Sequence, residues 1–173
     1  MKVIQTHYRG HYFRSRLEAR YAVFFDALNE KWVYEKEGYD LDEGDFYLPD
    51  FWLPRLECHV EIKGQYPKKE EIRKCRKLQF FTEHDVVIFD GLPTENYGLW
   101  FGWCDNGGFP TESYAAWTID DGFLALTDYA GEPSDMLQAA AVRAKQARFQ
   151  RHDPDLPIGV PYPNIVDYDR IPF

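Results

Sequence analysis

The segment from Leu56 to Lys63 alternates polar and apolar side chains, with His59, Glu61 and Lys63 on one side of the pattern and Cys58, Val60 and Ile62 on the other. A period of two residues is typical of a β-strand whose two faces have different surroundings. A helical period follows at residues 68–83, and residues 85–89 are then a continuous apolar run, typical of a strand buried on both faces. This succession of strand, helix and buried strand favours an α/β core.

The preceding residues extend this core. Residues 15–30 carry apolar side chains at helical spacing after Ser15, which can cap the first turn of a helix. Strands are predicted at 31–41 and 46–53, and Pro49 confines the second to a strand that is short, bulged or near a sheet edge. The order over residues 15–90 is therefore helix, strand, strand, strand, helix, strand, which indicates a mixed sheet flanked by helices.

The remaining residues predict an extension of this core. β-prone stretches at 99–104, 114–119 and 122–128 favour additional antiparallel strands, and an Ala-rich helix is predicted at 134–150. We expect one domain over residues 1–151, with its core at 8–90, a β-rich extension at 91–132 and a C-terminal helix at 133–151. Residues 152–173 are predicted to be a Pro-rich tail.

Composition and cysteine usage narrow the class of protein. Hydrophobic residues make up 45% of the 173 residues and charged residues 28%, which excludes a disordered, collagen-like or coiled-coil chain. The three cysteines form no CxxC pair, so a disulfide framework and a cysteine zinc site are both disfavoured and a cytoplasmic location is expected. No apolar run follows the basic residues near position 1, and we expect neither secretion nor membrane insertion.

The charge is unevenly distributed along the chain. The formal net charge of -9 argues on its own against a polyanionic partner. However, residues 1–20 hold five Lys or Arg against one Glu, and residues 62–77 hold seven against two, whereas residues 78–142 hold 11 Asp or Glu and no Lys or Arg. Two interpretations stay open: the acidic stretch is a solvated face, or it faces away from a polyanion that the basic segments contact.

Two carboxylates and a lysine form the most informative pattern in the sequence. Asp50 follows Pro49, and Glu61-Ile62-Lys63 comes eleven residues after Asp50 on the next predicted strand. Glu61 and Lys63 are two residues apart and share a strand face, and the neighbouring strand can bring Asp50 beside Glu61. Paired carboxylates suit Mg²⁺, which prefers oxygen ligands and can activate water and stabilise a leaving oxygen.

This pattern resembles the PD-(D/E)XK nuclease superfamily, which has the restriction-endonuclease-like fold. The resemblance covers about residues 8–90 and implies an αβββαβ core with a mixed central sheet, here extended by antiparallel strands and a C-terminal helix. It implies a Mg²⁺-dependent endodeoxyribonuclease, in which Mn²⁺ can substitute, that hydrolyses phosphodiester bonds of DNA. Asp50, Glu61 and the backbone carbonyl of Ile62 would bind the metal, and Lys63 would orient or activate the attacking water.

The resemblance also implies an acidic residue on the first helix, which Glu18 matches as a catalytic and metal-binding residue. Within the superfamily, the chain looks most like the resolvase-like and transposon-end-cleaving branches, and like a phage or mobile-element protein. Gln65 is a candidate contact near the scissile bond. Four arginines are candidate phosphate ligands, because guanidinium groups bind phosphate bidentately: Arg9, Arg14, Arg16 and Arg20.

Several alternatives stay open at this point. Ser15-Arg16-Leu17-Glu18 also satisfies the capping-box pattern, in which Glu18 would accept a hydrogen bond from the backbone of Ser15. His59 is expected to pack or hydrogen-bond rather than to bind a metal, and Gln79 either contacts the site or is structural. The second class of function is a catalytically inactive protein of the nuclease fold that binds nucleic acid or a protein, with an acidic surface that imitates DNA. A homodimer and a phage or mobile-element protein partner both stay open.

Overall fold

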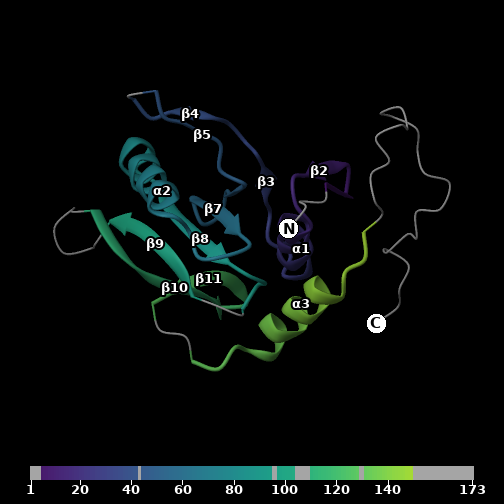
Figure 1. Ribbon diagram of the computed structural model, residues 1–173. Coiled ribbons are helices and arrows are strands. Elements are labelled where there is room, and N and C mark those ends of the chain that lie inside the picture. Colours follow the sequence, from purple (N-terminus) through teal and green to yellow (C-terminus); the bar gives the residue numbers. More distant parts are fainter. Residues whose placement is uncertain (1–4, 43, 95–96, 104–109, 129–130, 150–173) are drawn as a thin grey trace, which may run out of the picture.

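A computed structural model describes residues 5–149 except 43, 95–96, 104–109 and 129–130. The described residues form a mixed α/β fold (Figure 1). The helices are α1 (Arg16–Ala27), α2 (Lys69–Thr82) and α3 (Asp135–Gln146). The strands, in chain order, are β1 (Thr6–Tyr8), β2 (His11–Phe13), β3 (Val33–Tyr34), β4 (Tyr39–Asp40), β5 (Phe46–Tyr47), β6 (Phe51–Leu53), β7 (Cys58–Lys63), β8 (Asp85–Asp90), β9 (Gly98–Trp103), β10 (Pro110–Asp120) and β11 (Phe123–Thr127).

Seven of these strands form the central sheet, in the order β11-β10-β9-β8-β7-β6-β3. Strands β7 and β8 are parallel, because α2 connects them and returns the chain to the starting edge, and the other neighbours in the sheet are antiparallel. The mixed sheet and its antiparallel extension through β9, β10 and β11 confirm the coarse α/β prediction. Two short hairpins, β1-β2 and β4-β5, pair separately from this sheet.

Helices cover both faces of the sheet. In Figure 1, α2 lies on one side and α1 and α3 lie on the other. The alternation predicted for β7 has this cause: Cys58, Val60 and Ile62 pack in the larger core against α1, whereas His59 and Glu61 lie on the other face. The apolar strand β8 serves both sides, with Val87 and Phe89 in the larger core and Val86 and Ile88 in the smaller core under α2.

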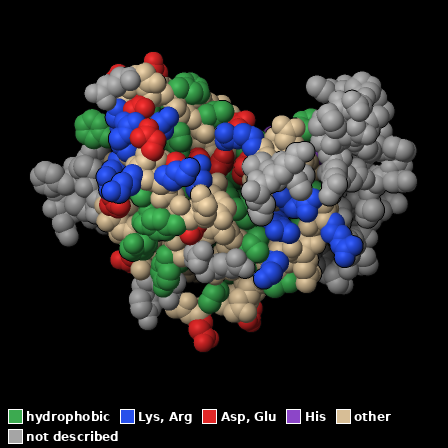
Figure 2. Space-filling view, viewed as in Figure 1, with side chains coloured by type: hydrophobic (Ala, Val, Ile, Leu, Met, Phe, Trp, Pro, Cys, Tyr) green, Lys and Arg blue, Asp and Glu red, His purple; other side chains and the backbone are tan. Residues whose placement is uncertain are grey.

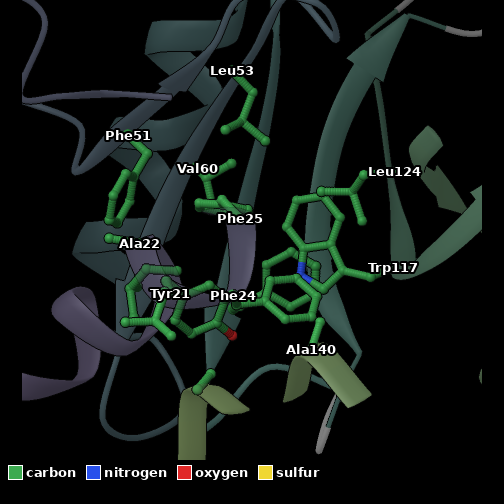
Figure 3. Packing of buried hydrophobic residues seen from close by; sticks show 14 of the residues in the cluster. Tyr21, Ala22, Phe24, Phe25, Phe51, Leu53, Val60, Trp117, Leu124 and Ala140 are labelled. Atoms are coloured by element: carbon green, nitrogen blue, oxygen red, sulfur yellow. The ribbon is translucent and has the colours of Figure 1, made fainter. Parts of the chain in front are cut away.

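Aromatic rings dominate the larger core, as Figure 3 shows. Tyr21, Phe24 and Phe25 from α1 are fully buried, and the Trp117 ring stacks on Phe89 with 4.8 Å between ring centroids. Ala140 of α3 also lies in this core, and its small side chain allows α3 to pack closely there. Part of the high aromatic content is therefore used to pack α1 and α3 on the sheet.

Some predicted elements differ from the structure. The strand expected at 31–41 is split into β3 and β4, because Glu35 has a φ of 45° that ends the extended conformation. The strand expected at 46–53 is split into β5 and β6 around Pro49, whose ring and missing N–H prevent continuous pairing. The third helix ends at Gln146, and the β1-β2 hairpin was not predicted.

Other expectations concern the cysteines, the tail and a membrane. Cys58 and Cys75 are buried free thiols, and Cys104 lies outside the described residues. The predicted tail at 152–173 also lies outside them. Of the helices in the described ranges, none has the length and apolar character needed to span a membrane.

Candidate active site

Asp50 lies directly before β6, at the end of the sheet where β6 pairs with β7. It is 2% exposed, and its Oδ2 accepts a hydrogen bond of 2.8 Å from the backbone N–H of Ile62. Its own backbone N–H donates to Glu61 Oε2 at 3.3 Å. Two adjacent antiparallel strands therefore bring Asp50 and Glu61 together, as the sequence spacing predicted.

Glu61 and Lys63 lie on the same face of β7. Glu61 is 3% exposed, and its Oε1 lies 2.5 Å from Lys63 Nζ. Lys63 Nζ also lies 3.4 Å from Glu71 Oε1. Glu71 belongs to the first turn of α2, where its other carboxylate oxygen accepts from the backbone N–H of Lys68 at 2.7 Å. The helix that follows β7 thus supplies a second carboxylate to the lysine.

Glu18 joins the site from α1, on the opposite face of the sheet. Ser15 caps the helix, because its Oγ accepts from the Glu18 N–H at 3.1 Å. The Glu18 carboxylate accepts instead from the Arg14 N–H at 3.1 Å and from the Tyr34 hydroxyl at 2.6 Å. Only the serine half of the predicted capping box is therefore present. Glu18 is 6% exposed, and its carboxylate lies close enough to Asp50 to raise the pKa of Asp50.

Arg14 carries the guanidinium that contacts this site most directly. Its Nη2 lies 2.6 Å from Asp50 Oδ1, and its Nε lies 2.8 Å from Glu35 Oε1. Glu35 follows β3, and its backbone N–H donates to the Asp50 carbonyl at 2.9 Å, because β3 pairs with β6. Arg14 thus lies across two carboxylates that the edge of the sheet holds side by side.

The electrostatic state of Asp50 follows from this crowding. Burial and the negative charges of Glu61 and Glu18 raise the pKa of Asp50 well above its ordinary value. The hydrogen bond from the Ile62 N–H and the positive charge of Arg14 lower this pKa but do not outweigh the other effects. For Lys63, burial disfavours the ammonium, but the carboxylates of Glu61, Asp50 and Glu71 outweigh burial and raise its pKa. Lys63 is therefore a cation at neutral pH.

The oxygen-only donors of Asp50 and Glu61 suit a hard divalent cation, which would relieve the repulsion that raises the pKa of Asp50. Within the described residues, no group of three or more His, Cys, Asp or Glu side chains is arranged as a metal site. Mg²⁺ is usually held by one or two carboxylates and keeps several waters, so Asp50 and Glu61 fit such an ion as a pair. The carbonyl of Ile62 and the carboxylate of Glu18 stay predicted ligands.

The other arginines predicted to bind phosphate have different surroundings. Arg9 is paired with Asp26 at 3.2 Å and lies on the β1-β2 turn. Arg16 and Arg20 are half-buried on α1, and their Nε atoms are buried with no hydrogen-bond partner within the described part of the chain. Gln65 is exposed just after β7. The structure thus groups only Arg14 of the four with the carboxylates.

Two further polar residues are buried, one on α2 and one on β7. Gln79 is 2% exposed on α2, as its place in the apolar stripe predicted. His59 is also 2% exposed, and its ring lies against Trp52, with 4.6 Å between centroids. The Tyr39 hydroxyl lies 3.4 Å from His59 Nε2. These contacts support the packing and hydrogen-bonding interpretation of His59.

The basic outer side of α2 is partly occupied by acidic side chains. Arg73 and Lys77 both bind Asp45, at 2.5 and 2.8 Å, and Arg76 binds Glu112. The last of these pairs joins the basic segment to the acidic stretch at 78–142, so the two are not fully segregated. Figure 2 likewise shows acidic side chains beside Lys and Arg side chains on the face between α2 and α1.

Three residues of the site were not predicted from the sequence: Tyr34, Glu35 and Glu71. Tyr34 and Glu35 are placed by the register of β3 on β6, where Tyr34 pairs with Phe51. Glu71 is placed by its role at the start of α2. The available signal for Glu71 was its position three residues after Lys68, at the beginning of a predicted helix.

Comparison of the chain with protein-family models and with curated proteins found no match in either set. The geometry of Asp50, Glu61 and Lys63 and the pattern of these residues in the sequence are therefore the observations that bear on function.

Proposed function

We propose that the protein is a Mg²⁺-dependent nuclease that hydrolyses phosphodiester bonds of DNA. The observation that carries the proposal is the convergence of Asp50, Glu61 and Lys63 at one end of adjacent strands, with Glu18 nearby from α1. With the separate β4-β5 hairpin left out, the elements follow in the order α1, β3, β6, β7, α2, β8, and β7 and β8 are parallel; this order supports the αβββαβ core that the resemblance implies.

In this proposal, Asp50 and Glu61 hold the divalent cation. The bound ion would supply Lewis-acid polarisation of the phosphodiester and a lowered pKa for water. Lys63 carries a raised pKa, so its ammonium donates hydrogen bonds to a water or phosphate oxygen and stabilises negative charge there rather than removing a proton. Glu61 and Glu71 orient that ammonium from two sides.

The test is the nicking of supercoiled plasmid DNA in Mg²⁺ by the wild type and by the variants Asp50→Asn and Lys63→Ala. Loss of a ligand or of a charge-stabilising donor is expected to lower the rate by about 100-fold or more. Asp40→Asn and Lys69→Ala are matched controls, because both residues are exposed and lie outside the site. Both controls are expected to cut at the wild-type rate.

Equal nicking by all five proteins, or nicking that persists in EDTA, would refute the proposed mechanism. Circular dichroism and thermal melting of each variant distinguish a chemical defect from loss of the fold. Calorimetric titration with Mn²⁺ is an independent readout, in which Glu61→Ala is expected to abolish saturable binding that the wild type shows.

One observation favours the second candidate, a noncatalytic nuclease-fold protein that binds nucleic acid or a protein. Each of the three central carboxylates already has protein donors: Tyr34 for Glu18, Arg14 for Asp50 and Lys63 for Glu61. A network of this kind can be structural rather than catalytic. An absence of Mn²⁺ binding at millimolar concentration, together with an absence of nicking, would favour this candidate over the nuclease.

A further inference from the structure

The position of Arg14 differs from that of an ordinary phosphate-binding arginine. It lies between β2 and Ser15, the residue that caps α1, and its backbone N–H contacts Glu18 and the Tyr34 hydroxyl, each at 3.1 Å. Its side chain reaches Asp50 Oδ1 with one nitrogen and Glu35 with another. The backbone is therefore fixed by the site, while the guanidinium bridges a buried carboxylate and a more exposed one.

The two carboxylates that Arg14 joins are not equivalent. The Asp50 side chain is 4% exposed, whereas that of Glu35 is 29% exposed. The Arg14 side chain itself is 52% exposed, so it can leave Asp50 without opening the core. Lys63 contrasts with it, since its side chain is 25% exposed and held between Glu61 and Glu71.

Arg14 also occupies a carboxylate oxygen that the proposed nuclease needs. A guanidinium 2.6 Å from this oxygen repels a divalent cation that approaches Asp50, because both are positively charged, so the arginine and the cation compete for the same carboxylate. Glu35 offers the guanidinium a second partner when it leaves Asp50. Once Asp50 no longer neutralises it, the guanidinium fork fits a phosphate group bidentately.

We propose that Arg14 is an exchangeable counterion of Asp50, which a divalent cation displaces and which then binds a phosphate of the nucleic acid. The inference rests on the proposed function and concerns the regulation of the same site. It couples metal binding to substrate binding: each cation that enters at Asp50 frees a guanidinium for the polyanion. In the absence of metal and nucleic acid, Arg14 therefore neutralises Asp50 and competes with a cation for it.

The first test is calorimetric titration with Mn²⁺ alone. Arg14→Gln removes the competitor, and we expect it to bind Mn²⁺ on the order of tenfold more tightly than the wild type, a usual coupling between charged groups in contact. Arg9→Gln is the matched control: it removes the same charge from an arginine that is paired with Asp26, and its Mn²⁺ affinity is expected to stay within about twofold of wild type.

The second test is plasmid nicking at saturating Mg²⁺, where Arg14→Gln is expected to be slower than the wild type because it lacks the freed phosphate ligand. Tighter metal binding combined with slower nicking cannot arise from loss of the fold, which would weaken both. Arg14→Lys keeps the positive charge, but an ammonium group cannot contact two carboxylates as the planar guanidinium does. Its Mn²⁺ affinity is therefore expected to lie between those of the wild type and Arg14→Gln.

The outcomes separate this inference from the proposed function. If the wild type binds Mn²⁺ and folded Arg14→Gln binds it equally or more weakly, the counterion role is wrong while the metal site stands. If Arg14→Gln does not fold, Arg14→Lys decides, and an affinity no higher than that of the wild type overturns the inference. If the wild type shows no saturable Mn²⁺ binding, the metal site and the counterion role are both wrong.

Discussion

His59 should make the protein lose stability as the pH falls below neutrality. Its ring is 2% exposed in β7, between Tyr39 and Trp52. Burial, together with the smaller effects of His84 and Lys36, lowers the pKa of His59 to about 4, although Glu37 acts in the opposite direction. In the unfolded chain the pKa of a histidine is about 6.5. The folded protein therefore resists a proton that the unfolded chain accepts.

The sign and size follow from linkage. A folded pKa below the unfolded pKa gives stability that is fully present above about pH 6.5 and is lost as the pH falls toward about 4. The difference between these two values corresponds to about 3 kcal/mol when fully expressed. At pH 5 the ratio of protonation in the two states gives a loss of about 2 kcal/mol relative to pH 7.5.

Urea denaturation of the wild type and His59→Gln at pH 7.5 and pH 5 measures this contribution. His59→Gln lowers stability at both pH values through altered packing, so the quantity of interest is the change between them. That change is expected to be about 2 kcal/mol more unfavourable in the wild type than in the variant. Comparing the two proteins also cancels the opposite pH dependence of Asp50, which both share.

His11→Gln is the matched control, because it makes the same replacement at an exposed histidine. The ring proton resonances of His59 give a direct check by NMR and should not titrate between pH 8 and pH 5.5. A His59 midpoint near 6.5, or equal pH dependence in wild type and His59→Gln, would show that the reasoning from burial is wrong.

Two further predictions concern stability. Arg55 lies 2.6 Å from Glu30, whose side chain is 3% exposed, so Arg55→Ala leaves a buried unpaired charge and should lower the free energy of unfolding in urea by about 3 kcal/mol. Arg76→Ala, which breaks the exposed pair with Glu112, should cost less than about 1 kcal/mol, and equal losses would contradict this distinction. Asp50 has a folded pKa above its unfolded value, so its charge reduces stability as the pH rises above the ordinary Asp range. The stability of Asp50→Asn relative to wild type should therefore increase between pH 5 and pH 8, and a decrease in urea denaturation experiments would refute that sign.

The elements with a strong period were predictable from the sequence. In α2, Cys75, Leu78 and Gln79 form the buried stripe that helical spacing predicted. In β7, the alternation separated the apolar side chains of the larger core from Glu61 and Lys63, and it placed the two charged residues together. Such patterns are informative because each residue's environment repeats along the element.

The shorter elements were not predictable in the same way. Strands β1 and β2 have three residues each, too few for a period to be recognised, and their turn depends on Arg9 and Gly10 at φ of 46° and 81°. The break after β3 depends on Glu35 at positive φ, which no local residue preference indicates. Tertiary pairing determines these backbone conformations, so a single sequence contains little signal for them.

The partner of Arg14 also depends on tertiary structure. From the sequence, an arginine before a helix suits either a phosphate or a carboxylate equally well. The choice in the structure follows from the pairing of β3 with β6, which places Glu35 beside Asp50 within reach of Arg14. Asp50 and Glu61 were therefore predictable from spacing along the chain, whereas Glu35 and the contact of Arg14 with both Glu35 and Asp50 were not.

The balance of charge distinguishes this site from the other ion pairs of the protein. On α2, Asp45 contacts two cations, Arg73 and Lys77, and Arg73 also contacts Glu70, so two acids meet two cations there. At the candidate site, buried Glu18, Asp50 and Glu61 lie together with Arg14 and Lys63, and both cations also contact a further glutamate. An excess of buried negative charge is unfavourable for folding and increases the affinity of the site for any positive ion. The raised pKa of Asp50 is this increased affinity expressed for a proton. A divalent cation would satisfy the same excess without protonation of Asp50, so the feature that costs stability is also the one that suits the site to metal-dependent chemistry.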